Sequence, residues 1–206
     1  MTTLQQIAPQ EIEAESFRII ERELGPTTFT TEQFAVVRRI IHATGDFSFA
    51  QNLRFHPQAI DAGLSAIRSG KNILVDVSMA QSGISHALLG KFGGKVICRV
   101  HDEETIRLAK EKGVTRSDAA VSLACADSIG IVAVGNAPTA LLKVMELIDA
   151  GTFAPALVIG VPVGFVNAAE SKDILVEKPD PFITALGRKG GTPVAVAAIN
   201  ALLRLA

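Results

Sequence analysis

The 206-residue sequence contains no tryptophan, no tyrosine and only two cysteines. Its 20 basic and 21 acidic residues leave a net charge of −1. Proteins that bind nucleic acids need a basic surface for the phosphates and commonly stack aromatic side chains on the bases. Because both features are missing, we expect no DNA or RNA partner.

Long hydrophobic runs are also missing. The longest stretch without a charged residue covers residues 150–169, but glycines and prolines interrupt it too often for a membrane helix. We interpret it as a buried strand flanked by loops. Residues 1–15 lack a basic region followed by an apolar stretch, so nothing marks them for secretion and we expect a cytoplasmic protein without a membrane partner.

The common cofactor and hydrolase motifs do not occur. The sequence has no GxGxxG dinucleotide fingerprint, no GxxxxGK[ST] phosphate loop, no HExxH metal motif and no GxSxG nucleophile elbow. Cys98 and Cys125 lie far apart and outside any CxxC pattern, so we interpret both as small buried hydrophobic residues. We therefore expect no metal and no cofactor.

The distribution of apolar residues predicts an α/β fold. Helical periodicity marks residues 9–24, 30–45 and 57–69, with Thr30 and Gln33 forming a capping-box pattern. Strand-length apolar runs then alternate with helical stretches, which is typical of a parallel sheet covered by helices on both faces. The strands are expected at residues 72–77, 95–100, 129–134, 157–161 and 182–185, and the helices at 84–92, 103–112, 117–124, 138–149, 166–176 and 193–205. No linker divides the chain, so residues 1–206 are expected to form a single domain with about five parallel strands and a helical N-terminal segment.

Ligands of such folds bind outside the carboxyl ends of the strands. The predicted loops at that edge, residues 78–83, 135–139, 162–164 and 187–191, are rich in glycine and other small residues. Several of them open onto helix N-termini, whose free N–H groups attract carboxylates and phosphates.

His42 is the first candidate for chemistry. It lies in the last predicted turn of the second helix, with Arg38 and Arg39 one turn before it. Histidine titrates near neutral pH and so suits proton transfer. The alternative is a capping role, in which the imidazole bonds a terminal carbonyl of the helix.

Basic residues near predicted helix starts are the candidates for binding an anion. Arg188 and Lys189 stand between glycines just before the last helix, so side chains and backbone there suit an anionic ligand. The alternative is a solvated surface turn. Arg116 also precedes a predicted helix. The alternative to anion binding is that this segment only caps the helix while the Arg116 side chain lies in solvent.

Six sequence strings, taken together and in order, resemble the precorrin-8X methylmutase (cobalt-precorrin-8 methylmutase) family. They are Ser16-Phe17-Arg18-Ile19-Ile20, Arg39-Ile40-Ile41-His42-Ala43-Thr44-Gly45-Asp46, Val134-Gly135-Asn136-Ala137-Pro138-Thr139-Ala140-Leu141, Gly160-Val161-Pro162-Val163-Gly164-Phe165-Val166, Ala169-Glu170-Ser171-Lys172 and Arg188-Lys189-Gly190-Gly191. The resemblance covers roughly residues 12–205.

The resemblance implies a flavodoxin-like three-layer α/β/α sandwich and an isomerase of cobalamin (vitamin B12) biosynthesis. The family's reaction moves a methyl group from C-11 to C-12 of the corrin precursor, giving hydrogenobyrinate, or cobyrinate from the cobalt-containing substrate. The family's proton-handling histidine corresponds to His42, and its substrate contacts correspond to Ser16, Arg39 and, less closely, Arg116. The resemblance also implies a homodimer, with the apolar last helix as one candidate for the contact surface.

The proposed reaction explains the missing motifs, because an intramolecular methyl shift needs no nucleotide, metal or covalent nucleophile. The substrate carries many carboxylates, which suits Arg39, Arg116, Arg188 and Lys189. Two other functions stay open: a tetrapyrrole carrier without catalytic activity, and a flavodoxin-like FMN or nucleotide binder. Against the second stand the missing phosphate loop and the missing Trp and Tyr.

Overall fold

The computed structural model describes residues 7–206 and contains one six-stranded mixed sheet. The strand order is β1-β6-β5-β4-β2-β3, and every neighbouring pair is parallel except β1 and β6. The strands are β1 (Leu53–Phe55), β2 (Asn72–Val75), β3 (Val96–Ile97), β4 (Ile129–Val134), β5 (Leu157–Gly160) and β6 (Phe182–Ala185). The α/β prediction is therefore correct, with β2 to β6 at the five expected places. The expectation of an all-parallel sheet is wrong, because the short strand β1 adds an antiparallel edge.

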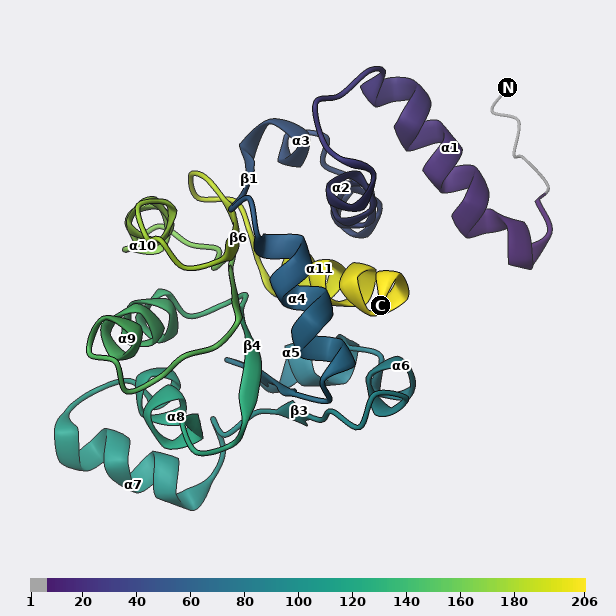
Figure 1. Ribbon diagram of the computed structural model, residues 1–206. Helices are drawn as coiled ribbons and strands as arrows, with labels where there is room; N and C mark the ends of the chain where they lie inside the picture. Colours follow the sequence, from purple (N-terminus) through teal and green to yellow (C-terminus); the bar gives the residue numbers. More distant parts are fainter. Residues whose placement is uncertain (1–6) are drawn as a thin grey trace.

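Helices cover both faces of this sheet (Figure 1). One face packs against α4 (Ala59–Arg68), α5 (Ser78–Gly83), α6 (His86–Gly90) and α11 (Thr192–Leu205), with α1 (Ile12–Leu24) and α2 (Thr31–Thr44) outside α11. The other face packs against α8 (Arg116–Ala124), α9 (Pro138–Asp149) and α10 (Ala168–Val176), with α7 (Glu103–Lys112) outside α8. The short elements η1 (Pro9–Glu11) and α3 (Phe49–Asn52) complete the described helices.

The central strands β4 and β5 contain only apolar residues and glycine, and both of their sides are buried. Every residue of β4, β5 and β6 is buried, which is the pattern expected of a doubly covered sheet. In Figure 1 the yellow helix α11 lies inside the molecule, between α2 and the sheet. Nine of its residues are buried within the chain, so α11 is a core helix and no longer a candidate for the dimer surface.

Two local expectations are wrong. Residues 78–83 form helix α5 and not a loop, and the helix expected over residues 84–92 is the shorter α6. Helix α1 forms as expected, but Ile20 is the only buried residue among Ile12–Leu24, and Ile12 is 52% exposed. Figure 1 shows the reason: α1 lies at the edge of the molecule and packs mainly against α2.

The remaining local predictions agree with the structure to within a few residues. Thr30 and Gln33 form the capping box at the start of α2, and Gly45 ends that helix with φ +64°. Cys98 and Cys125 are less buried than predicted, since both are only partly buried. Among residues 7–206, no helix combines the length and the hydrophobicity that crossing a bilayer requires.

Candidate active site

His42 lies in the last turn of α2, where its ring is exposed. The edge of the Phe17 ring from α1 meets it at 5.4 Å between centroids. The helix is ended by Gly45, whose N–H donates to the carbonyl of Ile41, so His42 is not its C-cap. No hydrogen bond within residues 7–206 involves the His42 ring, so its nitrogens are open to a ligand.

The two arginines one turn before His42 are paired with carboxylates of α1. Arg39 donates to both oxygens of Glu13, at 3.1 and 3.2 Å, and this contact holds the pKa of Glu13 below its ordinary value. Arg38 pairs with Glu21 and lies over the Phe17 ring. Glu21 and Glu13 therefore balance the positive charges of the two arginines beside His42. The sequence does not predict this arrangement, because it depends on how α1 packs against α2.

A hollow of about 220 Å³ adjoins His42. It lies between α2 and the first half of α11 and is lined by Arg39, His42, Ala43, Pro193, Val196, Ala197 and Asn200. Asn200 serves the structure, since its amide bonds the backbone of Gly83 and Ser85. The hollow thus offers an imidazole and a guanidinium beside an apolar wall, which suits a ligand with carboxylates on an apolar frame.

The predicted basic loop, residues 187–191, reaches the end of α2. The ammonium of Lys189 donates to Asp46 at 2.6 Å and to Ser48 at 2.9 Å. The bond from Lys189, together with hydrogen bonds from Ser48, lowers the pKa of Asp46 to about 2. The structure therefore brings Lys189 to the segment that follows His42, while Arg188 lies over the ring of Phe165, 5.4 Å from its centre.

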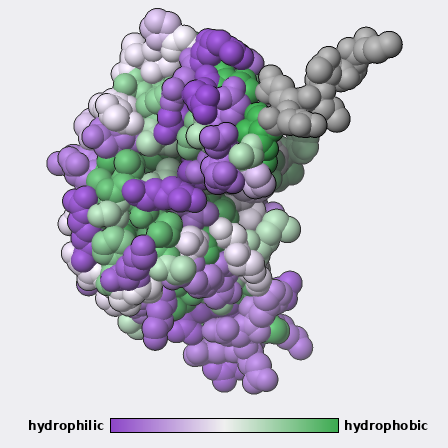
Figure 2. Space-filling model, turned by 90° about the vertical axis from the view of Figure 1, so that its right-hand side faces the viewer, coloured by the Kyte–Doolittle hydropathy of each residue, from purple (hydrophilic) through white to green (hydrophobic). Residues whose placement is uncertain are grey.

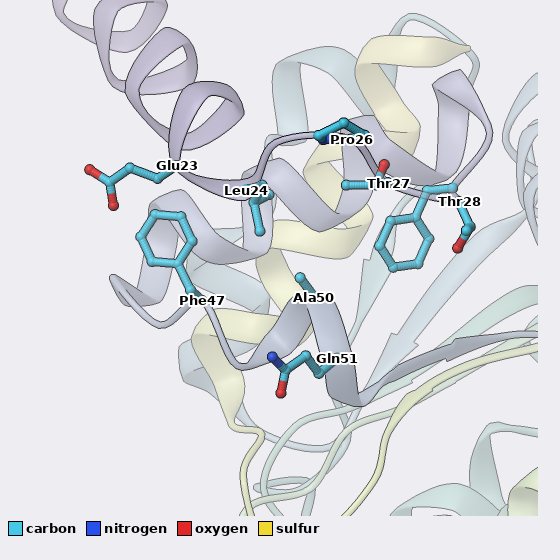
Figure 3. A pocket seen from close by; sticks show the side chains of 9 residues that line it. Glu23, Leu24, Pro26, Thr27, Thr28, Phe47, Ala50 and Gln51 are labelled. Carbon is cyan, nitrogen blue, oxygen red and sulfur yellow. The ribbon is translucent and has the colours of Figure 1, made fainter.

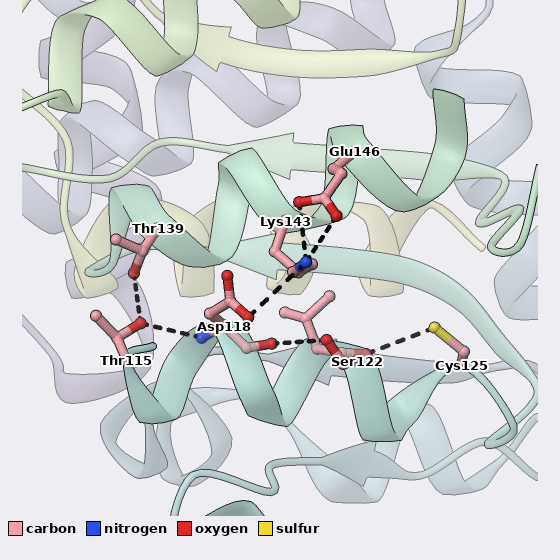
Figure 4. Close-up of polar contacts among 8 residues, drawn as sticks. Thr115, Asp118, Ser122, Cys125, Thr139, Lys143 and Glu146 are labelled. Atoms are coloured by element: carbon pink, nitrogen blue, oxygen red, sulfur yellow. Dashed lines mark hydrogen bonds and ion pairs between the residues drawn. The ribbon is translucent and has the colours of Figure 1, made fainter. Parts of the chain in front are cut away.

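Ser16 and Arg116 are the other two predicted site residues. Ser16 is hydrogen-bonded within its own helix, and Arg116 lies apart from His42. The hydroxyl of Ser16 donates to the carbonyl of Ile12 inside α1, one turn before Ile20. Arg116 is exposed at the start of α8, in the helix layer on the opposite face of the sheet. Figure 4 shows the polar contacts that hold this helix to α9: Thr115 bonds Thr139 at 2.8 Å, and Lys143 lies 4.0 Å from Asp118. No contact between described residues joins Arg116 to His42.

Asp76 is a polar centre that the sequence analysis missed. It follows β2, is only 3% exposed, and accepts three backbone N–H groups of the loop after β4: Gly135 at 3.1 Å, Asn136 at 2.8 Å and Ala137 at 2.7 Å. Burial raises its pKa, against the effect of these three bonds. The only signal in the sequence is a charged residue near the end of the predicted strand 72–77, because the partners are backbone groups that no motif records.

Lys172 was also missed as an individual residue, although it belongs to one of the six strings. It lies in α10 and is fully buried, and its ammonium donates to the backbone carbonyl of Lys189 at 2.7 Å. Burial lowers its pKa to about 8. A lysine in a helix beside Glu170 and Asp173 normally indicates a solvated surface, so no local pattern predicts this burial.

Four hollows of the described residues are larger than the one at His42, and the two largest measure about 510 Å³ each. The first lies between the end of α1, the α1–α2 linker and α3 (Figure 3). Its lining contains no histidine, lysine or arginine and therefore has no cation for an anionic ligand. The second lies beside α6 at the amino end of β3, away from the edge where ligands of parallel sheets bind. Of the other two, one is lined by Glu103, Glu104 and Arg107, and the other shares Arg39 with the hollow at His42 but does not include the imidazole. The hollow at His42 therefore fits the proposed chemistry best.

Comparisons with known proteins agree over nearly the whole chain. A family model described as precorrin-8X methylmutase matches residues 11–205. The chain is 47% identical to the cobalt-precorrin-8 methylmutase of Priestia megaterium, over 97% of this chain and 89% of the relative. It is 40% identical to the precorrin-8X methylmutase of a Sinorhizobium species, over 92% and 91%. The crystal structure of the precorrin-8x methyl mutase from Thermus thermophilus is similar, with a TM-score of 0.87 and 45% identity over 95% of this chain and 96% of that one.

Proposed function

The chain belongs to the precorrin-8X methylmutase family of cobalamin-pathway isomerases, and on this premise we propose that His42 supplies the proton for its methyl shift from C-11 to C-12. The observation that carries the proposal is the state of the His42 ring. It is exposed at a hollow, close to two cations that are already neutralised, and bonded to no described group. A ring nitrogen that is free to meet the substrate is the first requirement of a general acid.

The substrate carboxylates meet cations around this hollow. We propose that Arg39, Arg188 and Lys189 bind them, with Ser16 and Arg116 as further contacts. Arg39 and Lys189 already hold Glu13 and Asp46, so a substrate carboxylate has to share or replace these partners. Bidentate contacts between arginine and carboxylate are directional as well as strong, and so orient the macrocycle.

The macrocycle extends beyond the hollow, because about 220 Å³ is less than the volume of common ligand pockets. Apolar residues of the β5–α10 loop are exposed near it: Val163 by 47%, Phe165 by 83% and Val166 by 78%. Val163 lies against Gly191, two residues before the pocket residue Pro193. We propose that the apolar face of the macrocycle rests on this loop while its edge enters the hollow.

We also propose that the protein is a homodimer whose second copy covers part of the remaining exposed apolar surface. The face with α1 and α6, shown in Figure 2, mixes hydrophobic with hydrophilic residues, and the hydrophobic ones gather near its centre. Light scattering at micromolar concentration tests this, because a mass near 21.7 kDa would mean a monomer and would contradict it.

The strand order supports a flavodoxin-like arrangement of the parallel strands. The order β3-β2-β4-β5-β6 corresponds to the 2-1-3-4-5 order of flavodoxin-like folds, in which the ligand crevice opens where the chain reverses direction across the sheet. That reversal lies between β2 and β4, at Asp76 and the loop it holds. We propose that this fixed loop is the floor of the substrate site.

The test is incubation of the purified protein with cobalt-precorrin-8 and, separately, with precorrin-8X. Conversion of either to the isomer that carries the methyl group at C-12, detected by its absorption spectrum, supports the proposal. The substrate that is converted faster is the natural one. Tight binding without conversion would favour the tetrapyrrole carrier. Cytoplasmic location stays a prediction.

A further inference from the structure

Lys172 is a buried cation without a carboxylate partner. Its exposed fraction is 0%, and no salt bridge within residues 7–206 includes it. The one hydrogen bond of its ammonium goes to the backbone carbonyl of Lys189, at 2.7 Å. Removing a charge from water is costly, and burial lowers the pKa of Lys172 to about 8, although the nearby charge of Asp173 acts in the opposite direction. A feature that costs stability in this way is a candidate for function.

The group that Lys172 holds belongs to the 187–191 loop between β6 and α11. This loop is fixed at two other points: Gly164 donates to the carbonyl of Arg188 at 3.2 Å, and Gly191 donates to the carbonyl of Val161 at 2.8 Å. Gly190 passes so close to β5 that a Cβ atom there would lie 2.2 Å from the oxygen of Val161. Lys172 supplies the remaining anchor, at the centre of the loop.

The same loop residue reaches the segment after His42. While its carbonyl accepts from Lys172, the Lys189 side chain extends to Asp46 and Ser48, just past Gly45 at the end of α2. One residue therefore connects α10 to the helix that carries His42. A shift of the Lys189 backbone changes both the position of the two loop cations and their distance from the imidazole.

We propose that Lys172 is a positioning residue of the methylmutase reaction, which sets the 187–191 loop and its cations Arg188 and Lys189 against the His42 hollow through its bond to the Lys189 carbonyl. This inference rests on the proposed function of the loop as a binder of substrate carboxylates. Lys172 is itself buried and touches no ligand. Its effect is therefore on substrate binding, and only the loop transmits it.

Lys172→Met is the direct test, because methionine keeps an unbranched apolar chain and removes the ammonium. We expect a folded variant that is at least as stable as the wild type in urea. Its kcat/KM should fall by about ten- to a hundredfold, the scale of a small misplacement of binding groups. The loss should appear mainly in KM, since His42 stays in place. The matched control is Lys178→Met, which removes a lysine just after α10 whose partner Asp149 lies on the surface, and which should leave kcat/KM unchanged.

A double-mutant cycle with Arg188→Gln shows whether the loop carries the effect. If Lys172 acts through the loop, Lys172→Met adds little to the loss already caused by Arg188→Gln, whereas independent effects multiply. Multiplying effects, an unchanged kcat/KM or an unfolded Lys172→Met variant would each overturn the inference. The two proposals fail differently: a wild type that converts neither corrinoid refutes the proposed function, and an active wild type matched by Lys172→Met refutes only the role of Lys172.

Discussion

Replacing Asp76 with alanine is expected to destabilise the protein by about 3 kcal/mol, because it leaves three backbone N–H groups without their acceptor. Each buried donor that loses its partner costs about 1–3 kcal/mol. Most of this loss comes from the N–H of Gly135, because Gly135 is buried. Asn136 is exposed and Ala137 is partly exposed, so water can replace the lost acceptor there. Part of the loss is offset, because burial raises the pKa of Asp76 and removing the carboxylate ends that cost.

Asp76→Asn separates the hydrogen bonds from the side-chain volume. Oδ2 accepts from Asn136 and Ala137, so an amide oxygen at that place keeps both bonds. The amide nitrogen then faces the N–H of Gly135, donor against donor. We expect a smaller loss than for alanine, about 2 kcal/mol.

Urea unfolding followed by far-UV circular dichroism is the suitable assay, since the chain has neither tryptophan nor tyrosine for fluorescence. With a slope of about 2 kcal/mol per molar urea, the Asp76→Ala midpoint should fall by about 1.5 M. Glu111→Ala is the control, because its only ion pair within residues 7–206 is a long surface contact with Arg107. It should change stability by less than about 0.5 kcal/mol. An Asp76→Ala midpoint within about 0.3 M of the wild type would refute the assigned role of the carboxylate.

Three further predictions concern local features. Thr30→Ala removes the capping box of α2 and should cost about 1 kcal/mol in urea unfolding; no change would mean that the cap adds nothing. Gly190→Ala forces the loop away from Val161 and should lower kcat/KM, with normal activity as the contrary result. The charged ammonium of Lys172 destabilises the folded protein. Its pKa is about 8 when folded and 10.5 ordinarily, so this loss of stability is complete below pH 8 and becomes smaller as the pH rises from 8 to 10.5. The stability gained by Lys172→Met, up to about 3 kcal/mol at pH 7, should shrink over that range, and a constant gain would contradict this.

The layered α/β fold was predictable from the sequence because its signals are local. Apolar runs of strand length and helical periodicity identified β2 to β6 and the long helices, and the pattern of Thr30, Gln33 and Gly45 gave both ends of α2. Strand β1 escaped prediction because three residues carry no periodicity, and its pairing with β6 depends on the whole fold. The sequence predicts a loop in place of helix α5, because the serines and glycine of this segment are typical of turns.

The candidate site was predictable only in part. The sequence pointed to His42 and to the basic loop, and the structure brings Lys189 to the end of the helix that carries His42. The sequence did not reveal that Glu13 pairs with Arg39 and that Asp46 pairs with Lys189, because each pair joins residues that are far apart in the chain. Lys172 shows the same limit, because burial of a helical lysine depends on what packs against it.

The most direct test of the proposed mechanism is the turnover of cobalt-precorrin-8 and precorrin-8X by His42→Ala beside the wild type. The exposed ring makes no described bond, so the variant should fold and still bind the corrinoid. If His42 supplies the proton, kcat should fall by about a hundredfold or more. A His42→Ala variant that binds the corrinoid and turns it over at nearly the wild-type rate would contradict the proposal.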